Sequence, residues 1–162
     1  AHRRENLGEP MENMFKAIKR VLQDHSNVKV IYPIHKNPRV REVANRIFGD
    51  EDRVKLIEPL EVIDFHNFLN KSYLILTDSG GIQEEAPSLG KPVLVLRDTT
   101  ERPEGVAAGT LKLVGTKEED IYNNFKLLLE NNEEYKKMSQ ASNPYGDGRA
   151  SERIAEVLLK EI

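Results

Sequence analysis

Apolar residues recur along the chain in two different patterns. Between positions 11 and 25 they are spaced by three or four residues, which predicts an amphipathic helix. These residues are Met14, Phe15, Ile18, Val21 and Leu22. Elsewhere, short β-branched and apolar stretches are bounded by turn residues and predict buried strands. These stretches are residues 28–34, 54–57, 73–77 and 93–96, with a weaker one at 110–114.

Segments with helical spacing separate these strands. Pro38 suits the first turn of a helix that turns Val40, Val43, Ala44 and Ile47 inward and ends at Gly49. Further helices are predicted at 61–70 (with Ile63, Phe65, Phe68 and Leu69), 81–89, 118–130, 133–141 and 149–160, the last burying Ile154, Val157 and Leu158. Strands that alternate with helices form βαβ units, so we expect an α/β fold with a doubly wound, Rossmann-like parallel sheet.

Composition limits the classes of function. The 162 residues suit one domain, and 24 Lys and Arg against 27 Asp and Glu give a net charge of −3, which argues against a nucleic-acid binder. The chain has no cysteine, which excludes disulfides and thiolate chemistry, and no histidine pair has a spacing that requires a metal. We therefore expect neither a metal nor a cofactor. No apolar run approaches the ~20 residues of a membrane span and no signal peptide is visible, so a cytoplasmic protein is expected.

Unusual polar segments follow the predicted strands. Ligands of doubly wound sheets bind outside the carboxyl ends of the strands. The segments that would lie there are residues 2–6, 35–37, 78–81 and 97–105. A polar cluster such as residues 2–6 usually follows a strand, so we expect a strand before Ala1 and therefore a longer native chain.

Residues 78–85 carry the clearest chemistry. Ser79, Gly80 and Gly81 open a helix directly after a buried strand. Glycines let the backbone approach a ligand, and the free N–H groups of a helix start bind anions, typically phosphate. Glu85 lies one turn further on, where its carboxylate can accept hydrogen bonds from sugar hydroxyls. An ordinary strand-to-helix turn with Ser79 as its N-cap explains the same residues.

Other candidates lie in the remaining segments. Arginines in residues 97–105 can bind a phosphate through the guanidinium fork, although a solvated charged loop is the alternative. His2 is a candidate for proton transfer beside two arginines, and His35 is a similar but weaker candidate. Phe65 offers a stacking surface for a base, or it is an ordinary core aromatic.

Taken together, these segments resemble a known family. The stretches are residues 2–6 (HRREN), 32–38 (YPIHKNP), 77–92 (TDSGGIQEEAPSLGKP), 97–105 (RDTTERPEG) and 143–148 (NPYGDG). They resemble the bacterial non-hydrolysing UDP-N-acetylglucosamine 2-epimerases over essentially the whole chain. The resemblance implies the C-terminal, nucleotide-binding half of a two-domain GT-B fold, spanning residues 1–162, with the N-terminal domain absent. The family interconverts UDP-GlcNAc and UDP-ManNAc for cell-surface polysaccharides, by elimination and re-addition of UDP.

The resemblance also implies roles for individual residues. Ser79, Gly80 and Gly81 would bind the diphosphate, Glu85 the ribose and Arg102 a phosphate. Phe65 and the backbone near Leu60 would flank the uracil. His2 corresponds to the active-site histidine, and Arg3 and His35 would bind a second UDP-GlcNAc that acts as an activator.

Two other functions fit the same features. One is the donor-binding half of a GT-B glycosyltransferase, and the other is a non-catalytic UDP-binding module. The intact SGGIQEE turn and the 97–105 loop favour the epimerase. The family's principal catalytic carboxylates lie in the N-terminal half, so we expect this chain alone to bind UDP weakly and to be inactive. The resemblance also implies that the full-length enzyme forms a homodimer through that half, leaving this chain monomeric.

Overall fold

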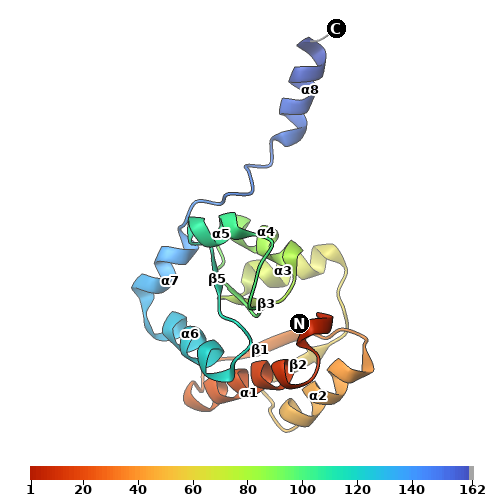
Figure 1. Ribbon diagram of the computed structural model, residues 1–162, viewed down its shortest axis with the longest axis vertical. Helices are drawn as coiled ribbons and strands as arrows, with labels where there is room; N and C mark the ends of the chain where they lie inside the picture. The colour runs from red at the N-terminus through yellow and green to blue at the C-terminus, as the bar shows by residue number, and fades with distance from the viewer. Residues whose placement is uncertain (161–162) are drawn as a thin grey trace.

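Among residues 1–160, which the computed structural model describes, five short strands alternate with helices (Figure 1). The strands are β1 (Val30–Pro33), β2 (Val54–Ile57), β3 (Ile75–Thr77), β4 (Val93–Val95) and β5 (Leu111–Leu113). The helices are η1 (Arg4–Asn6, a 3-10 turn), α1 (Glu9–Asp24), α2 (Pro38–Phe48), α3 (Val62–Lys71), α4 (Gly80–Ser88), α5 (Pro103–Ala108), α6 (Glu118–Glu130), α7 (Asn132–Ser139) and α8 (Ala150–Lys160). This order confirms the α/β class predicted from the sequence.

All strand pairs are parallel, and within the described residues they fall into two groups. β1 pairs with β2, while β3, β4 and β5 pair in that order. The first residues of the chain connect the two groups at the carboxyl ends of the strands. The hydroxyl of Tyr32 at the end of β1 donates to the carbonyl of Ala1 at 2.7 Å. Just beyond, the backbone N–H groups of His2 and Arg3 donate to Asp78, directly after β3.

Two clusters of buried side chains hold the fold together. The larger one is built on α1, whose apolar face packs against α2 and α6. The smaller one joins α3 and α4 to the sheet of β3, β4 and β5; its members are Leu69, Ile75, Ala86, Val93, Val95 and Leu111. Burying such a side chain contributes roughly 1.5–3 kcal/mol, so these clusters fix the strand ends that carry the polar loops.

Two helices leave apolar residues exposed, and in α8 this contradicts the predicted burial. In α3 only Leu69 is buried, whereas Ile63 is 74% exposed. α8 forms as predicted, but Ile154, Val157 and Leu158 are each more than half exposed. Figure 1 shows why, because α8 projects away from the other helices and none of the described chain covers its apolar stripe.

Two elements were not predicted, the 3-10 turn η1 and the helix α5. Residues 97–105 were expected to be a loop, yet α5 begins inside this segment at Pro103, which occupies the first helical turn as its fixed φ favours. No helix within residues 1–160 is long and apolar enough to cross a bilayer.

Candidate functional site

The start of α4 lies at the carboxyl edge of the sheet, directly after β3. The backbone N–H of Ser79 donates to the Thr77 hydroxyl at 3.0 Å, which turns the chain into the helix. Ser79 occupies the N-cap position, but within the described residues its side chain caps no N–H of the helix. Side-chain capping therefore does not account for this residue. Its hydroxyl and the first N–H groups of α4 remain able to bind an anion.

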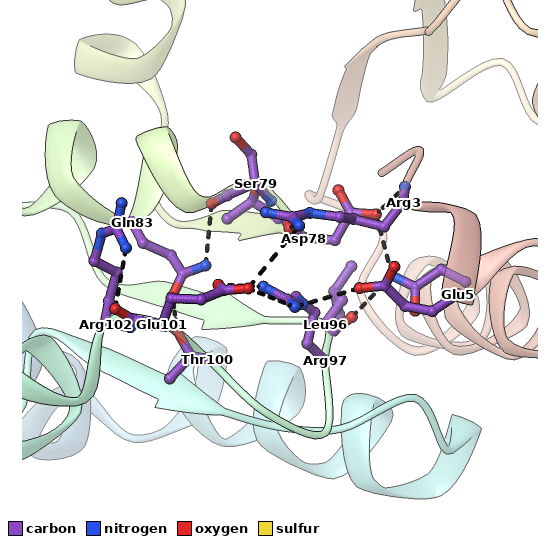
Figure 2. A network of polar contacts seen from close by, with 12 residues as sticks. Arg3, Glu5, Asp78, Ser79, Gln83, Leu96, Arg97, Thr100, Glu101 and Arg102 are labelled. Atoms are coloured by element: carbon purple, nitrogen blue, oxygen red, sulfur yellow. Dashed lines mark hydrogen bonds and ion pairs between the residues drawn. The ribbon is translucent and has the colours of Figure 1, made fainter.

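Two guanidinium groups from distant parts of the sequence flank Gly80. A Cβ atom built on Gly80 would lie 3.7 Å from Nη2 of Arg3 and 3.8 Å from Nη2 of Arg102. Arg3 comes from the start of the chain and Arg102 from the residue before α5, so the fold has brought them together (Figure 2). Two guanidinium groups beside the positive end of a helix dipole favour an anion here. In this structure Arg3 pairs with Glu101 at 4.0 Å and Arg102 pairs with Glu84, so a bound anion would compete with these two carboxylates.

A buried glutamine ties the Arg102 loop to α4. Gln83 is fully buried, its amide N–H donates to the carbonyl of Ser79 at 3.1 Å, and its carbonyl accepts the Thr100 hydroxyl at 2.5 Å. The Thr100 hydroxyl oxygen in turn accepts the backbone N–H of Arg102 at 3.1 Å, and the Arg102 guanidinium pairs with Glu84. The sequence predicts no role for Gln83, whose only signal is its place within the SGGIQEE turn.

Arg97 has a different environment from Arg102. Its guanidinium is largely buried and donates to Glu101 at 2.6 and 3.0 Å, with Glu5 a further 3.3 Å ion pair. The hydrogen bond from Arg97 lowers the pKa of Glu101 to about 2. Two hollows adjoin Arg97 and Asp98, one of about 150 Å³ and one of about 320 Å³, and neither includes Arg3 or Arg102 in its lining. Arg97 therefore stabilises the loop, while Arg3 and Arg102 face the helix start.

Asp78 fixes the opening segment of the chain against the end of β3. It is 1% exposed, and its Oδ2 atom accepts the N–H groups of His2 at 2.8 Å, of Arg3 at 2.9 Å and of the Asn6 side chain at 3.1 Å. Burial opposes ionisation of this carboxyl, but the nearby terminal amino group and these N–H donors more than offset it, and the pKa is lowered. The sequence marked the segment as functional without showing this role for Asp78.

The two candidate histidines lie together. The rings of His2 and His35 stack at 4.6 Å between centroids with an angle of 4° between their planes. Burial, partly offset by the charge of Asp78, lowers the pKa of His2, which favours the neutral imidazole near pH 7.

Glu85 and Phe65 lie further along the same face. The Glu85 carboxylate pairs with Nε2 of His66 at 3.0 Å, and its Oε1 lies 3.4 Å from the Cβ position of Gly81. Phe65, beside His66 on α3, is half-buried against the cluster that contains Ile75. Its ring therefore has at least a packing role.

The structure thus joins the predicted residues into one arrangement at one edge of the fold. Arg3, Gly80 and Arg102 lie within reach of one another, with Ser79 and Gly81 on either side of Gly80. His2 precedes Arg3 in the chain, and Asp78 accepts hydrogen bonds from the backbone N–H groups of both residues. The stacked rings of His2 and His35 therefore lie next to this group. The described residues contain no cluster of His, Asp and Glu able to hold a metal ion.

Comparison with known proteins matches the chain to one family. The family described as UDP-N-acetylglucosamine 2-epimerase matches residues 1–159. A Bacillus subtilis UDP-N-acetylglucosamine 2-epimerase is 75% identical over 98% of this chain, which spans 42% of that relative. The solved S. aureus MnaA–UDP complex superimposes with a TM-score of 0.94 at 60% identity, over 99% of this chain and 45% of that one. A Neisseria meningitidis UDP-GlcNAc 2-epimerase bound to UDP-GlcNAc gives 0.92 at 52% identity, over 98% and 43%.

Proposed function

The chain belongs to the UDP-N-acetylglucosamine 2-epimerase family, and we propose that it forms the UDP-binding, C-terminal half of an enzyme that interconverts UDP-GlcNAc and UDP-ManNAc. The observation that carries the proposal is the start of α4 with the guanidinium groups of Arg3 and Arg102 on either side of Gly80. A diphosphate carries the charge that this arrangement attracts. The solved relatives with UDP and with UDP-GlcNAc support the choice of ligand.

Each part of the nucleotide has a proposed partner. The diphosphate binds the N–H groups of Gly80 and Gly81, the Ser79 hydroxyl and Arg102. The ribose hydroxyls donate to Glu85, which exchanges its pairing with His66 for them. The uracil stacks on Phe65 beside the backbone near Leu60. The proposed order along this face is therefore base, ribose and diphosphate.

The same contacts serve the chemistry. In an elimination that releases UDP, negative charge develops on the diphosphate, and preorganised N–H groups and a guanidinium stabilise it more than they stabilise the bound substrate. His2 moves a proton at the sugar. The remaining catalytic carboxylates belong to the part of the enzyme that this chain does not span, so the chain alone is inactive.

Arg3 and His35 serve a second nucleotide sugar. We place a UDP-GlcNAc activator against these two residues, beside the active site. Arg3 is suited to couple the two ligands, because its guanidinium lies close to Gly80 while its backbone is held by Asp78.

Isothermal titration of the chain with UDP tests this function, with UMP and ADP as controls. UDP is expected to bind, UMP to bind more weakly because it lacks the second phosphate, and Arg102→Ala to weaken UDP binding. Arg153→Ala is the matched control. Arg153 lies on α8, carries the same charge as Arg102 and pairs with Asp147, which precedes the helix. Equal binding of all three nucleotides, or no effect of Arg102→Ala, would contradict the assignment.

The remaining alternatives separate in an activity assay. Epimerisation of UDP-GlcNAc by the chain alone would refute the claim that this half is inactive. If UDP binds but the N-terminal half of a relative, added in trans, restores no activity, the non-catalytic UDP-binding module becomes the better account. Light scattering should show a monomer, because dimerisation is assigned to the other half.

A further inference from the structure

The two carboxylate oxygens of Asp78 differ in their contacts with the first residues of the chain. Oδ2 holds the backbone of residues 2 and 3, and the Asp78 carbonyl accepts Nε of Arg3 at 3.2 Å. Oδ1 is buried from solvent and accepts no hydrogen bond within the described residues. An ionised oxygen without a partner in such a place is costly and calls for a donor.

Two nitrogen atoms are close enough to become that donor. The amino group of Ala1 lies 3.9 Å from Oδ1, and Nδ1 of His2 lies 4.0 Å from it. The His2 imidazole is the only one of these groups that also reaches outward, because its side chain is 49% exposed. Neither nitrogen lies within hydrogen-bond distance of Oδ1, and Nδ1 of His2 would have to move about 1 Å closer to reach it.

His35 limits how the His2 ring can move. The two rings are nearly parallel at 4.6 Å, so the plane of the His2 ring is set by the stack. The backbone N–H of Asn37 donates to Nδ1 of His35 at 3.1 Å, which requires Nδ1 of that ring to be unprotonated. A neutral His35 therefore carries its proton on Nε2 and presents an apolar ring face to His2.

We propose that Asp78 is a positioning residue for His2, with Oδ1 accepting a hydrogen bond from Nδ1–H. A carboxylate on Nδ1 fixes the tautomer of a histidine and stabilises its imidazolium form. Nε2 of the neutral ring is then unprotonated and aimed away from Asp78, ready to take a proton from a bound sugar. This role rests on the proposed function, in which His2 transfers a proton, but the tautomer itself does not depend on it.

Four groups face the His2 ring and set its titration: Asp78, the Ala1 amino group, His35 and Arg3. Burial and the three cationic or titratable neighbours lower the pKa of His2, and only Asp78 raises it. Removing the charge of Asp78 must therefore lower this pKa further. Acetylation of Ala1 converts its amino group to an amide and separates the contribution of that group from the contribution of Asp78.

The test is NMR of the N-terminally acetylated chain with 15N-labelled histidine, with the His2 signals assigned by their loss in His2→Gln. We expect the neutral ring of His2 to carry its proton on Nδ1. In Asp78→Asn the pKa of His2 should fall and the proton should shift toward Nε2. Asp98→Asn, an exposed carboxylate in the next loop, is the matched control and should change neither.

Two results would overturn the proposal. One is a neutral His2 with its proton on Nε2 in the unmutated chain, a measurement that needs no variant to fold. The other is an unchanged His2 pKa and tautomer in a folded Asp78→Asn variant. UDP titration of the same samples separates this proposal from the proposed function. If the unmutated chain does not bind UDP, the proposed function is refuted, but the assignment of the His2 tautomer is not.

Discussion

Replacing Gly80 by alanine should separate ligand binding from folding. Gly80 begins α4 with an ordinary backbone conformation, since its φ is not among the positive values that only glycine tolerates. The added methyl group would lie 3.7 and 3.8 Å from the nearest atoms, the Nη2 atoms of Arg3 and Arg102, which is normal van der Waals contact. The fold therefore has room for the methyl group. A phosphate bound at the same place would collide with it.

The two effects differ in sign and size. Alanine in a helix costs less backbone entropy than glycine, so the free energy of unfolding should stay the same or rise by up to ~1 kcal/mol. A phosphate displaced from the guanidinium groups loses charge-assisted hydrogen bonds worth roughly 1.5–3 kcal/mol each. Losing one of them weakens UDP binding about tenfold to a hundredfold.

Titration calorimetry with UDP and chemical denaturation measure the two quantities on the same protein. Ser88→Ala is a suitable control at the other end of α4, because its hydroxyl donates only to the carbonyl of Glu85. That variant should bind UDP as the unmutated chain does. If Gly80→Ala leaves the affinity for UDP unchanged, or lowers the free energy of unfolding by more than ~2 kcal/mol, the phosphate does not bind against Gly80 as proposed.

Three further predictions concern stability. Gly105→Ala should lower the free energy of unfolding by about 1–3 kcal/mol through overpacking, because its Cβ would lie 2.5 Å from Cδ1 of the buried Leu111; denaturation with urea checks this, and an unchanged midpoint contradicts it. Leu158→Ser on the exposed stripe of α8 should change the free energy of unfolding by no more than ~0.5 kcal/mol. Leu128→Ala in the core should lower it by about 2–5 kcal/mol. Equal decreases in the two variants would mean that the apolar stripe of α8 is packed against other residues. The pKa of Asp78 is lowered on folding, so its contribution to stability is complete above the ordinary carboxyl value of ~3.9 and is lost as the pH falls through the lower folded value. The stability gap between the unmutated chain and Asp78→Asn, measured by urea denaturation at several pH values, should therefore narrow below about pH 4, and a constant gap would contradict this.

The sequence was sufficient for the class of fold because local pattern and global packing agree. The helical spacing in α1 became its buried face, and the continuous apolar run of β4 became a strand with both faces covered. The apolar stripe of α8 has the same kind of spacing and no cover in the described chain. Periodicity reports that a face is apolar, and it cannot report whether another part of the chain packs against it.

The candidate site was predictable only where one segment carried the signal. Ser79, Gly80 and Gly81 are consecutive, so their turn is visible in the sequence. Arg3 and Arg102 both reach Gly80 only through the packing of segments that are far apart along the chain. Gln83 and Asp78 matter because of partners that spacing does not reveal. Polar networks between loops depend on tertiary geometry. A local sequence motif can therefore identify the residues of such a network, but it cannot show which of them are hydrogen-bonded to one another.

A UDP titration of the 15N-labelled chain, followed by amide NMR, tests the diphosphate site at the start of α4 most directly. We expect the largest shifts on the backbone N–H groups of Gly80, Gly81 and Ile82 in the first turn of α4, and we expect these shifts to weaken in Arg102→Ala. Shifts centred elsewhere on the chain, or binding that leaves the first turn of α4 unchanged, would contradict a diphosphate site at this helix start.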